Sequence, residues 1–235
     1  MADQVSRRDF LKIGGAGAAG AAASAMGIAS VVGLSPEEAR ATEVEFVYTC
    51  PICGKKFGDY ESLKAHFDES HPDAGVPELA VLNINGTEYR VQIEPHWTLR
   101  ETLQFALGLT GSAKEMCDRG ACGSCTVLID GELALSCTTL AVECVGHEIE
   151  TIEGIAADEH WKPLVDAYVK YDTMQCGYCT PGQLTVAKQL LTRNPDPTED
   201  EIRLALSGNI CRCGTYMRHV LAIQEAARVL RGEEI

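Results

Sequence analysis

The order of apolar and polar residues divides the chain into a strand-rich part followed by a helical part. Apolar residues alternate with polar ones on both sides of Asn85-Gly86, between residues 79 and 93, which predicts a β-hairpin with a tight turn. Two further apolar runs flank Asp130-Gly131 and predict a second hairpin. Between the hairpins, apolar residues of the segment 99–107 recur at helical spacing after Thr98, a favourable N-cap. This order predicts a small mixed sheet packed against one helix.

From Trp161 onward the apolar residues recur at helical spacing. Thr180-Pro181 resembles an N-cap followed by a first-turn proline, Thr198–Glu201 forms a capping box, and Thr215 can cap a last helix. The apolar face predicted for the first of these helices consists of Leu164, Val165, Tyr168 and Val169. The predicted fold class is therefore α+β, with the strands before the helices.

The composition is ordinary for a globular protein, with 46% hydrophobic and 23% charged residues in a chain of 235. A chain of this length has room for one or two compact domains. The formal net charge of −14 argues against nucleic acid and against an anionic membrane surface as partners, because both require clustered lysine and arginine.

The first 41 residues have the features of an export signal. Arg7-Arg8 precedes an Ala- and Gly-rich apolar stretch over residues 13–34, and Ala39–Ala41 resembles a signal cleavage site. Two adjacent arginines before a weakly apolar run are typical of a twin-arginine signal, which a receptor reads. A retained membrane anchor is the weaker alternative, because glycine and alanine are poorly hydrophobic. An ordinary buried helix is disfavoured as well, because glycine destabilises helices. We therefore expect a signal peptide over residues 1–41, export of the folded protein to the periplasm, and no stable membrane span.

Residues 46–73 contain two cysteines and two histidines at the spacing of a C2H2 zinc finger, a family that this segment resembles. The four predicted ligands are Cys50, Cys53, His66 and His71, and the predicted core positions are Tyr48, Phe57 and Leu63. Two thiolates and two imidazoles form a closed tetrahedral site, so we expect bound Zn²⁺ and a small ββα module. The alternative is a Cys50–Cys53 disulfide with two solvated histidines. Acidic residues outnumber lysines in this segment, which argues against nucleic-acid binding and favours a structural or partner-docking role.

Eight of the eleven cysteines fall into two further blocks. The first block consists of Cys117, Cys122, Cys125 and Cys137, and the second of Cys176, Cys179, Cys211 and Cys213. The first spacing is that of plant-type ferredoxins, in which four thiolates hold a 2Fe-2S cluster. Glycines in this loop let the backbone approach such a cluster and donate N–H groups to sulfur. A disulfide framework is the alternative, and the close spacing of Cys211 and Cys213 disfavours it.

Both cysteine pairs of the second block lie directly before predicted helices, which places positive helix N-termini beside an anionic centre. Two such centres move single electrons, and the chain shows no catalytic residue of its own. Cys144, outside all of these groups, is expected to be a buried small apolar residue. Four histidines have no partner pattern and receive no role: His96, His147, His160 and His219.

Motifs over residues 79–231 resemble the small iron–sulfur subunit of the molybdenum hydroxylases, the family of xanthine oxidase and aldehyde oxidoreductase. The segments that carry the resemblance are Val81–Gly86, Thr98–Gly108, Cys117–Val127, Asp130-Gly131 before Ser136-Cys137, Thr151–Gly154, Gln175–Gly182 and Gly208–Cys213. The resemblance implies a β-grasp ferredoxin domain with one 2Fe-2S cluster over residues 78–155. It implies a four-helix domain with a second 2Fe-2S cluster over residues 158–231.

The same resemblance implies a partner, a separate large subunit that holds molybdopterin and oxidises an aldehyde or an N-heteroaromatic substrate. Gln175 and Cys213 match family positions that contact the pterin. Electrons would pass from molybdenum to the helical-domain cluster, then to the ferredoxin-type cluster, and then outward. The order Gly214–Tyr216 after the last cysteine looks like the isoquinoline oxidoreductase branch, which lacks a flavin subunit. That order favours a c-type cytochrome over a flavin subunit as the electron acceptor.

Two other functions are open on the sequence alone. One is a metal-binding regulatory or sensor protein that uses the finger and the clusters, and export together with the negative charge argues against it. The other is a soluble shuttle ferredoxin, and the Gln175–Gly182 and Gly208–Cys213 motifs argue against that.

Overall fold

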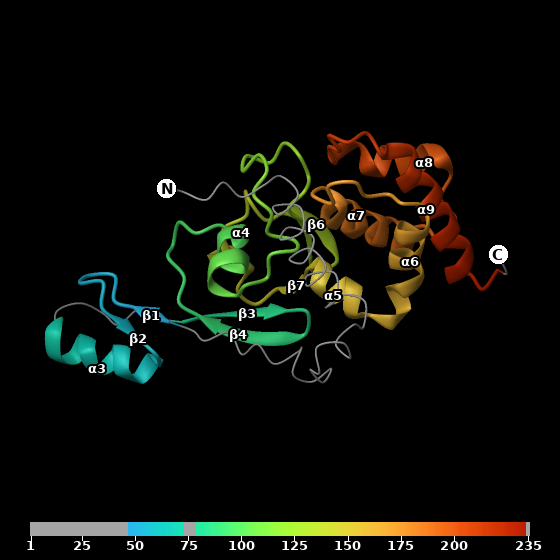
Figure 1. Ribbon diagram of the computed structural model, residues 1–235. Helices are drawn as coiled ribbons and strands as arrows, with labels where there is room; N and C mark the ends of the chain where they lie inside the picture. Colours follow the sequence, from blue (N-terminus) through green and yellow to red (C-terminus); the bar gives the residue numbers. More distant parts are fainter. Residues whose placement is uncertain (1–46, 73–78, 234–235) are drawn as a thin grey trace, which may run out of the picture. The chain divides into compact units, whose positions relative to one another are not determined.

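The computed structural model describes residues 47–72 and 79–233 of the chain (Figure 1). The predicted signal peptide, residues 1–41, lies outside the described residues. Within the described ranges, no helix is both long enough and apolar enough to cross a bilayer. Three consecutive segments are named here: the finger (residues 47–72), the ferredoxin half (residues 79–150) and the helical half (residues 151–233).

The finger consists of a minimal hairpin followed by one helix. Strands β1 (Tyr48–Thr49) and β2 (Lys56–Phe57) pair antiparallel, and helix α3 (Tyr60–Ser70) follows them. Asp59 caps this helix, because its carboxylate accepts a hydrogen bond from the Ser62 backbone N–H at 2.7 Å. The buried core of the finger contains Cys50, Leu63 and Phe67.

The ferredoxin half is built on a five-stranded sheet. Its strands are β3 (Ala80–Ile84), β4 (Thr87–Val91), β5 (Thr126–Ile129), β6 (Glu132–Leu135) and β7 (Glu148–Glu150). They lie in the order β4-β3-β7-β5-β6, with β3 and β7 parallel and all other pairs antiparallel. Both predicted hairpins are present. In each turn the Asn or Asp and the following Gly have positive φ, as tight two-residue turns require.

Within the ferredoxin half, one helical segment packs on this sheet. Thr98 and Glu101 form a reciprocal capping box at the start of α4 (Leu99–Glu101), which confirms the predicted start of this helix. The helix then widens into a π-helical turn, η1 (Thr102–Ala106), a detail that the spacing of apolar residues does not reveal. Leu99, Leu103 and Leu107 are buried against the inner side chains of the strands.

The helical half contains five α-helices and short connecting turns. The helices are α5 (Ile152–Ala157), α6 (Lys162–Lys170), α7 (Thr180–Arg193), α8 (Glu199–Ala205) and α9 (Tyr216–Leu230). The single-turn 3-10 segments are η2 (Ala141–Cys144, still in the ferredoxin half), η3 (Glu159–Trp161) and η4 (Leu206–Gly208). Helices α6 and α9 pack on each other, and α7 packs on β5 and β6 of the sheet. The α+β fold class is confirmed (Figure 1).

Three predicted helix details differ from the structure. Thr180 is the first residue of α7 and Cys179 occupies the N-cap position, so Thr180 does not cap this helix. Thr215 occupies the N-cap of α9, but its side chain makes no capping hydrogen bond. Val169 is exposed, because α6 is covered on a narrower face than the sequence predicts. The capping box between Thr198 and Glu201 at the start of α8 is confirmed.

Candidate metal centres

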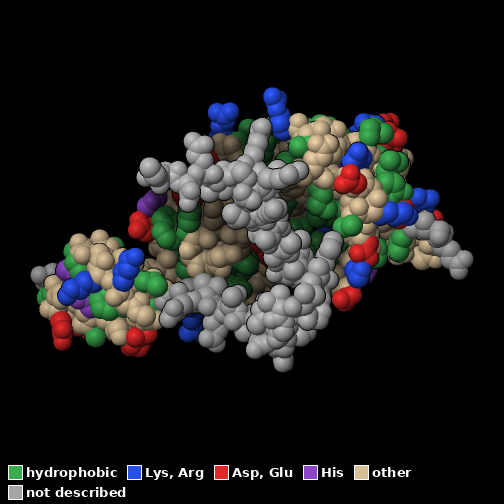
Figure 2. Space-filling model, viewed as in Figure 1, with side chains coloured by type: hydrophobic (Ala, Val, Ile, Leu, Met, Phe, Trp, Pro, Cys, Tyr) green, Lys and Arg blue, Asp and Glu red, His purple; other side chains and the backbone are tan. Residues whose placement is uncertain are grey.

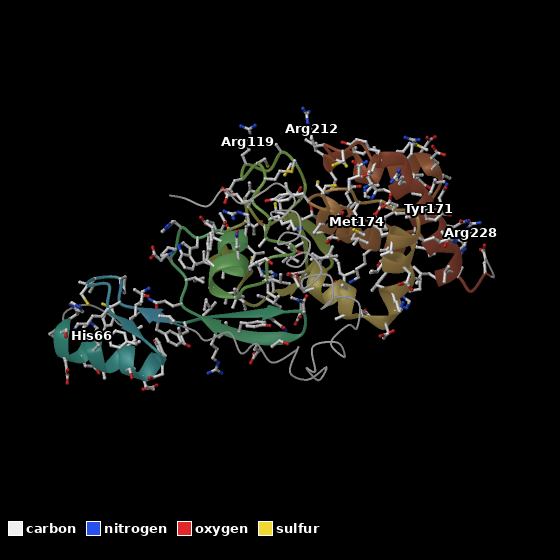
Figure 3. All side chains as sticks on the ribbon, in the orientation of Figure 1. His66, Arg119, Tyr171, Met174, Arg212 and Arg228 are labelled. Carbon is white, nitrogen blue, oxygen red and sulfur yellow. The ribbon has the colours of Figure 1, made fainter. Side chains whose placement is uncertain are left out.

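The finger brings its four predicted ligands together. One ligand atom from each of Cys50, Cys53, His66 and His71 lies within 4.8 Å of all the others. The Cys53 sulfur and the His66 Nε2 atom are 3.2 Å apart, and His71 Nε2 is buried without a hydrogen-bond partner among the described residues. His66 lies on α3 and is labelled in Figure 3. A buried ring nitrogen without a donor or acceptor suits a metal bond.

The electrostatics of the finger favour a neutral imidazole at His66 and ionisation of the Cys50 thiol, the protonation states in which these side chains bind metal. Burial lowers the pKa of His66, which keeps its imidazole neutral and able to coordinate. Burial opposes ionisation of Cys50, but backbone N–H groups of Cys53 and Ile52 outweigh it, so the pKa of this thiol lies below its ordinary value. The donor set of two thiols and two imidazoles therefore fits Zn²⁺.

Three cysteines of the first block, Cys117, Cys122 and Cys125, lie on the loop between η1 and β5, and Cys137 follows β6. The backbone N–H of Gly120 donates to the Cys137 sulfur at 3.3 Å, and that of Ala121 donates to the Cys117 sulfur at 3.3 Å. Burial raises the pKa of Cys117, but hydrogen bonds from the Arg119 backbone, the Cys122 thiol and neighbouring backbone groups outweigh it and bring the pKa to about 7. A loop that turns its N–H groups toward thiols fits an anionic iron–sulfur cluster.

A buried arginine anchors this loop, and the sequence did not reveal it. Arg100 is only 3% exposed, and its Nε donates to Asp118 at 2.7 Å while its Nη1 donates to Gln104 at 2.8 Å. Asp118 has a φ of +50°, so the bond to Arg100 holds a backbone turn that non-glycine residues rarely adopt. Arg119, by contrast, points into solvent, as expected for a loop charge (Figure 3).

The second block joins two distant parts of the helical half. The sulfurs of Cys176 and Cys213 lie 3.5 Å apart near the surface, and the thiols of Cys179 and Cys211 interact in the interior. Cys179 directly precedes α7 and Cys213 comes shortly before α9, as the sequence predicted. Gln175, the predicted pterin contact, is exposed beside Cys176.

Buried polar groups surround the inner thiols of this block. Within the helical half, four buried polar atoms make no hydrogen bond to another described residue, and they belong to Thr180, Gln183 (both amide atoms) and His219. The Gln183 amide lies beside the Cys179 thiol. Polar atoms of this kind are costly in a dry core unless a ligand satisfies them. The donor set of four thiols and unpaired polar groups therefore fits a 2Fe-2S cluster.

The two inner thiols differ in acidity. Burial raises the pKa of Cys179 to about 12. Burial acts on Cys211 in the same direction, but hydrogen bonds from Thr215 outweigh it and lower the pKa to about 7. His219, to which the sequence assigned no role, is fully buried beside Thr215, and burial lowers its pKa to about 4. Its ring is therefore neutral.

Hydrogen bonds connect the segments that carry the two cysteine blocks. The Ile210 N–H donates to the Cys122 carbonyl at 2.9 Å, so a residue next to Cys211 contacts a residue of the first block. The Asn209 side chain donates to the Gly123 carbonyl at 2.9 Å. A Cβ atom built on Gly182 would lie 2.0 Å from that carbonyl, so only glycine allows this close approach.

Comparison with known proteins agrees with this geometry. Residues 83–172 match the family described as 2Fe-2S iron-sulfur cluster binding domain, and residues 151–224 match the 2Fe-2S binding domain family. Residues 4–24 match the twin-arginine translocation pathway signal sequence.

Individual relatives cover both halves. The aldehyde oxidoreductase iron-sulfur-binding subunit PaoA of Escherichia coli (strain K12) is 42% identical over 183 residues, which cover 72% of this chain and 79% of the relative. The nicotinate dehydrogenase small FeS subunit of Eubacterium barkeri is 42% identical over 145 residues, 62% of this chain and 92% of the relative. A chain of the crystal structure of quinoline 2-oxidoreductase from Pseudomonas putida 86 matches with a TM-score of 0.62 and 41% identity, over 67% of this chain and 98% of that one.

The fold and the two cysteine blocks thus define an iron–sulfur electron-transfer protein with two 2Fe-2S domains. The chain belongs to the family of small iron–sulfur subunits of the molybdenum hydroxylases. It is an electron-transfer subunit of an oxidoreductase complex and carries a twin-arginine signal for export.

Proposed function

We propose that the eight block cysteines hold the two 2Fe-2S clusters, four thiolates each, and that this chain conducts electrons from a molybdopterin-binding partner to an external acceptor. Once bound to this chain, each 2Fe-2S cluster would accept and release one electron at a time. The chain's own residues hold the sulfurs, exclude water from the inner thiols and supply hydrogen-bond donors to them. The observation that supports this function best is the direct backbone contact between the blocks, Ile210 to Cys122.

The outer edge of the second block is the proposed docking site for the large subunit. Gln175 and Cys176 are exposed there, and Cys213 is partly exposed. Apolar side chains that are at least one-third exposed accompany them on the segments next to these cysteines: Met174, Tyr178, Ile210, Tyr216 and Met217. A partly exposed thiol pair with apolar neighbours fits a surface that a partner subunit covers. The pterin would then contact Gln175 and Cys213.

Relatives suggest the substrate class of the complex. Their names refer to aldehyde, nicotinate and quinoline oxidation, so we place an aldehyde or N-heteroaromatic substrate on the partner subunit. The twin-arginine signal supports a periplasmic complex. The order Gly214–Tyr216 favours a c-type cytochrome as the electron acceptor, with a flavin subunit as the alternative. Export of a folded chain protects clusters that are assembled in the reducing cytoplasm.

The finger is proposed to bind one structural zinc ion through Cys50, Cys53, His66 and His71. Support comes from the convergence of their ligand atoms within 4.8 Å and from the unpaired His71 Nε2. Figure 2 shows acidic and basic side chains interspersed on the surface of the finger, a distribution that suits protein contact better than phosphate binding. The zinc would stabilise the fold and take no part in electron transfer, because Zn²⁺ has no redox chemistry.

Metal analysis and low-temperature EPR of the reduced full chain test these assignments. We expect two distinguishable 2Fe-2S signals and an iron-to-zinc ratio of about four to one. Cys125→Ser and Cys179→Ser should each remove or alter a different signal. Cys144→Ser is the matched control, because Cys144 is buried but lies outside both blocks, and it should leave both signals unchanged. A single four-iron signal would refute the cluster assignment.

Purification of the exported chain tests the partner. We expect a molybdenum-containing subunit to copurify with the wild type, and a charge placed on the proposed docking edge, as in Met174→Glu, to weaken that association. The same substitution should leave both EPR signals in place, which separates loss of docking from loss of a cluster. Copurification that is unchanged by Met174→Glu would place the docking surface elsewhere.

A further inference from the structure

The Thr215 side chain links a cluster thiol to a buried histidine. Its Oγ1 lies 3.2 Å from the Cys211 sulfur and 3.1 Å from His219 Nε2. Cys211, Thr215 and His219 are all buried. Thr215 occupies the N-cap position of α9, where threonine ordinarily caps the helix with its hydroxyl, yet this hydroxyl makes no capping bond. The side chain is therefore committed to Cys211 and His219.

The chemistry of the three groups fixes the direction of both hydrogen bonds. A ligating cysteine is a thiolate, which only accepts hydrogen bonds, so Thr215 must donate its single hydroxyl proton to Cys211. The Thr215 oxygen can then only accept from His219, which places the ring proton on Nε2. His219 Nδ1 is left as a bare acceptor, and it is indeed buried without a partner among the described residues. An unpaired acceptor is tolerated in protein interiors more often than an unpaired N–H group.

We propose that His219 is a positioning residue that, through Thr215, holds a hydrogen bond on Cys211 and thereby raises the reduction potential of the helical-half cluster. This inference rests on the proposed function, in which Cys211 is a cluster ligand. Reduction adds negative charge that is shared with the ligating sulfurs, so a donor to a sulfur stabilises the reduced form more than the oxidised form. A hydroxyl that itself accepts a hydrogen bond is a stronger donor.

The surroundings of His219 keep the ring in place. Its centroid lies 5.2 Å from that of Tyr168, which is itself fully buried, and both belong to the core between α6 and α9. The rival interpretation is direct ligation, because a ring nitrogen of His219 and the sulfurs of Cys179 and Cys211 lie within 4.8 Å of one another. The N–H that Nε2 donates to Thr215 excludes ligation through Nε2, since a ligating nitrogen has no proton to donate. Ligation through Nδ1 is the form of this rival that the nitrogen hyperfine measurement below tests.

The two hydrogen bonds from His219 to Thr215 and from Thr215 to Cys211 are called the relay. Paired substitutions test the relay in the full chain, purified with its partner subunits. Thr215→Val removes the hydroxyl at nearly constant volume, and Thr215→Ser keeps it. His219→Leu removes the ring donor, and His219→Gln offers an amide N–H in its place. Thr185→Val is the matched control, because Thr185 is equally buried on α7 but its hydroxyl bonds only to the Pro181 carbonyl. EPR-monitored redox titration measures the two clusters separately, and the ferredoxin-half cluster serves as an internal reference.

Thr215→Val should lower the ratio of reduced to oxidised helical-half cluster about tenfold at a fixed potential, ~59 mV for a one-electron couple. His219→Leu should lower it roughly twofold to threefold. Thr215→Ser and His219→Gln should recover most of each loss. In the Thr215→Val background, His219→Leu should have no further effect, because its influence passes through the hydroxyl. An exchangeable-proton coupling in the ENDOR spectrum should vanish in Thr215→Val and persist in Thr215→Ser.

Three outcomes would overturn the relay. They are an unchanged potential in Thr215→Val, an equal effect of His219→Leu in both Thr215 backgrounds, and nitrogen hyperfine coupling typical of histidine ligation in the wild type. Cys211→Ser separates failure of the relay from failure of the proposed function. If that substitution leaves both EPR signals unchanged, Cys211 is not a ligand and the cluster assignment itself is wrong. If it alters one signal while Thr215→Val does not, only the relay is wrong.

Discussion

The finger and the helical half each gather four metal-binding side chains, but they differ in how much core surrounds them. The finger has three buried core residues, Cys50, Leu63 and Phe67, and one of these is a proposed ligand. The helical core contains seventeen buried residues, and none of the block cysteines belongs to it. Chains shorter than about 40 residues rarely fold without metal or disulfides, because their cores are too small.

This difference separates two uses of a metal centre. In the finger the metal takes the place of a core, so folding and zinc binding are one equilibrium. In the helical half the apolar contacts between α6, α7 and α9 provide the fold, and the cluster is held at its edge. Hydrogen-bond donors around the second site can therefore tune electron transfer without a large change in the stability of the fold.

The largest expected effect is loss of the finger when one zinc ligand is removed. We expect His71→Ala to unfold residues 47–72, because structural zinc contributes an apparent free energy of about 10–16 kcal/mol in modules of this kind. Zinc content and limited proteolysis measure the loss. His71→Cys is the control, since a Cys3His site still closes around zinc. A zinc-free finger that resists protease would show that its small core suffices, and the comparison would fail.

Core truncation should have different readouts in the two regions. Leu63→Ala in the finger should weaken zinc binding on the order of a hundredfold or more, because the lost packing, about 2–5 kcal/mol, appears in the binding constant. Ile223→Ala in α9 removes a comparable buried side chain. It should lower the free energy of unfolding by about 2–5 kcal/mol while iron content stays constant. Urea unfolding and metal analysis distinguish these outcomes, and iron loss in Ile223→Ala would contradict the expected separation of core and cluster.

A smaller effect is expected where the helical half meets the ferredoxin loop. Gly182→Ala places a Cβ atom against the Gly123 carbonyl and should cost about 1–3 kcal/mol of unfolding free energy through overpacking. Gly208→Ala is the matched control, because a Cβ there meets open space and should change stability by about 0.5 kcal/mol or less. Equal unfolding curves for the two variants would mean that the close approach between the blocks is not required.

The turns, helix starts and cysteine blocks could be predicted from the sequence, because each depends on residues that are close together in the chain. Asn85-Gly86 and Asp130-Gly131 specify their turns locally, and both hairpins are confirmed. The N-cap at Thr98 and the capping box between Thr198 and Glu201 were also predicted from neighbouring residues, and both are confirmed. The cysteine blocks were found by spacing, and the structure brings at least pairs of their thiols together.

The surroundings of Arg100, His219 and Thr215 could not be predicted from the sequence. Arg100 meets Asp118 only after the loop folds back, and no local pattern marks it as buried. His219 looks like any helical histidine until α9 packs on α6, where its ring meets Tyr168. Thr215 has the sequence context of a cap, but a thiol four residues earlier competes for its hydroxyl. The contacts of Arg100 with Asp118 and of His219 with Tyr168 join parts that only tertiary packing brings together, whereas the contact of Thr215 with Cys211 spans four residues.

The smallest expected effect is electrostatic and lies in the helical half, away from both metal sites. Glu225 on α9 is buried and accepts two hydrogen bonds from Lys170 and one from Tyr171, at 2.7–2.8 Å. The Lys170 ammonium, followed by the Tyr171 hydroxyl, holds the pKa of Glu225 below its ordinary value of 4.5. The carboxylate therefore contributes stability above that ordinary pKa, and the contribution is lost as pH falls through the lower folded value.

Glu225→Gln removes this charge and should lower the free energy of unfolding at pH 7 by about 0.5–1 kcal/mol, a modest figure because Lys170 is half-exposed and screened by water. The difference from the wild type should shrink with added salt, begin to fall once pH drops below the ordinary pKa of 4.5, and disappear as pH falls through the lower folded pKa of Glu225. Urea unfolding across this pH range measures it, with zinc and iron content followed in parallel. A difference that persists unchanged at low pH would assign the effect to packing of the glutamine rather than to the ion pair. If the metal content changed together with stability, the helical half would depend on its cluster as the finger depends on zinc, and the contrast between the two regions would be lost.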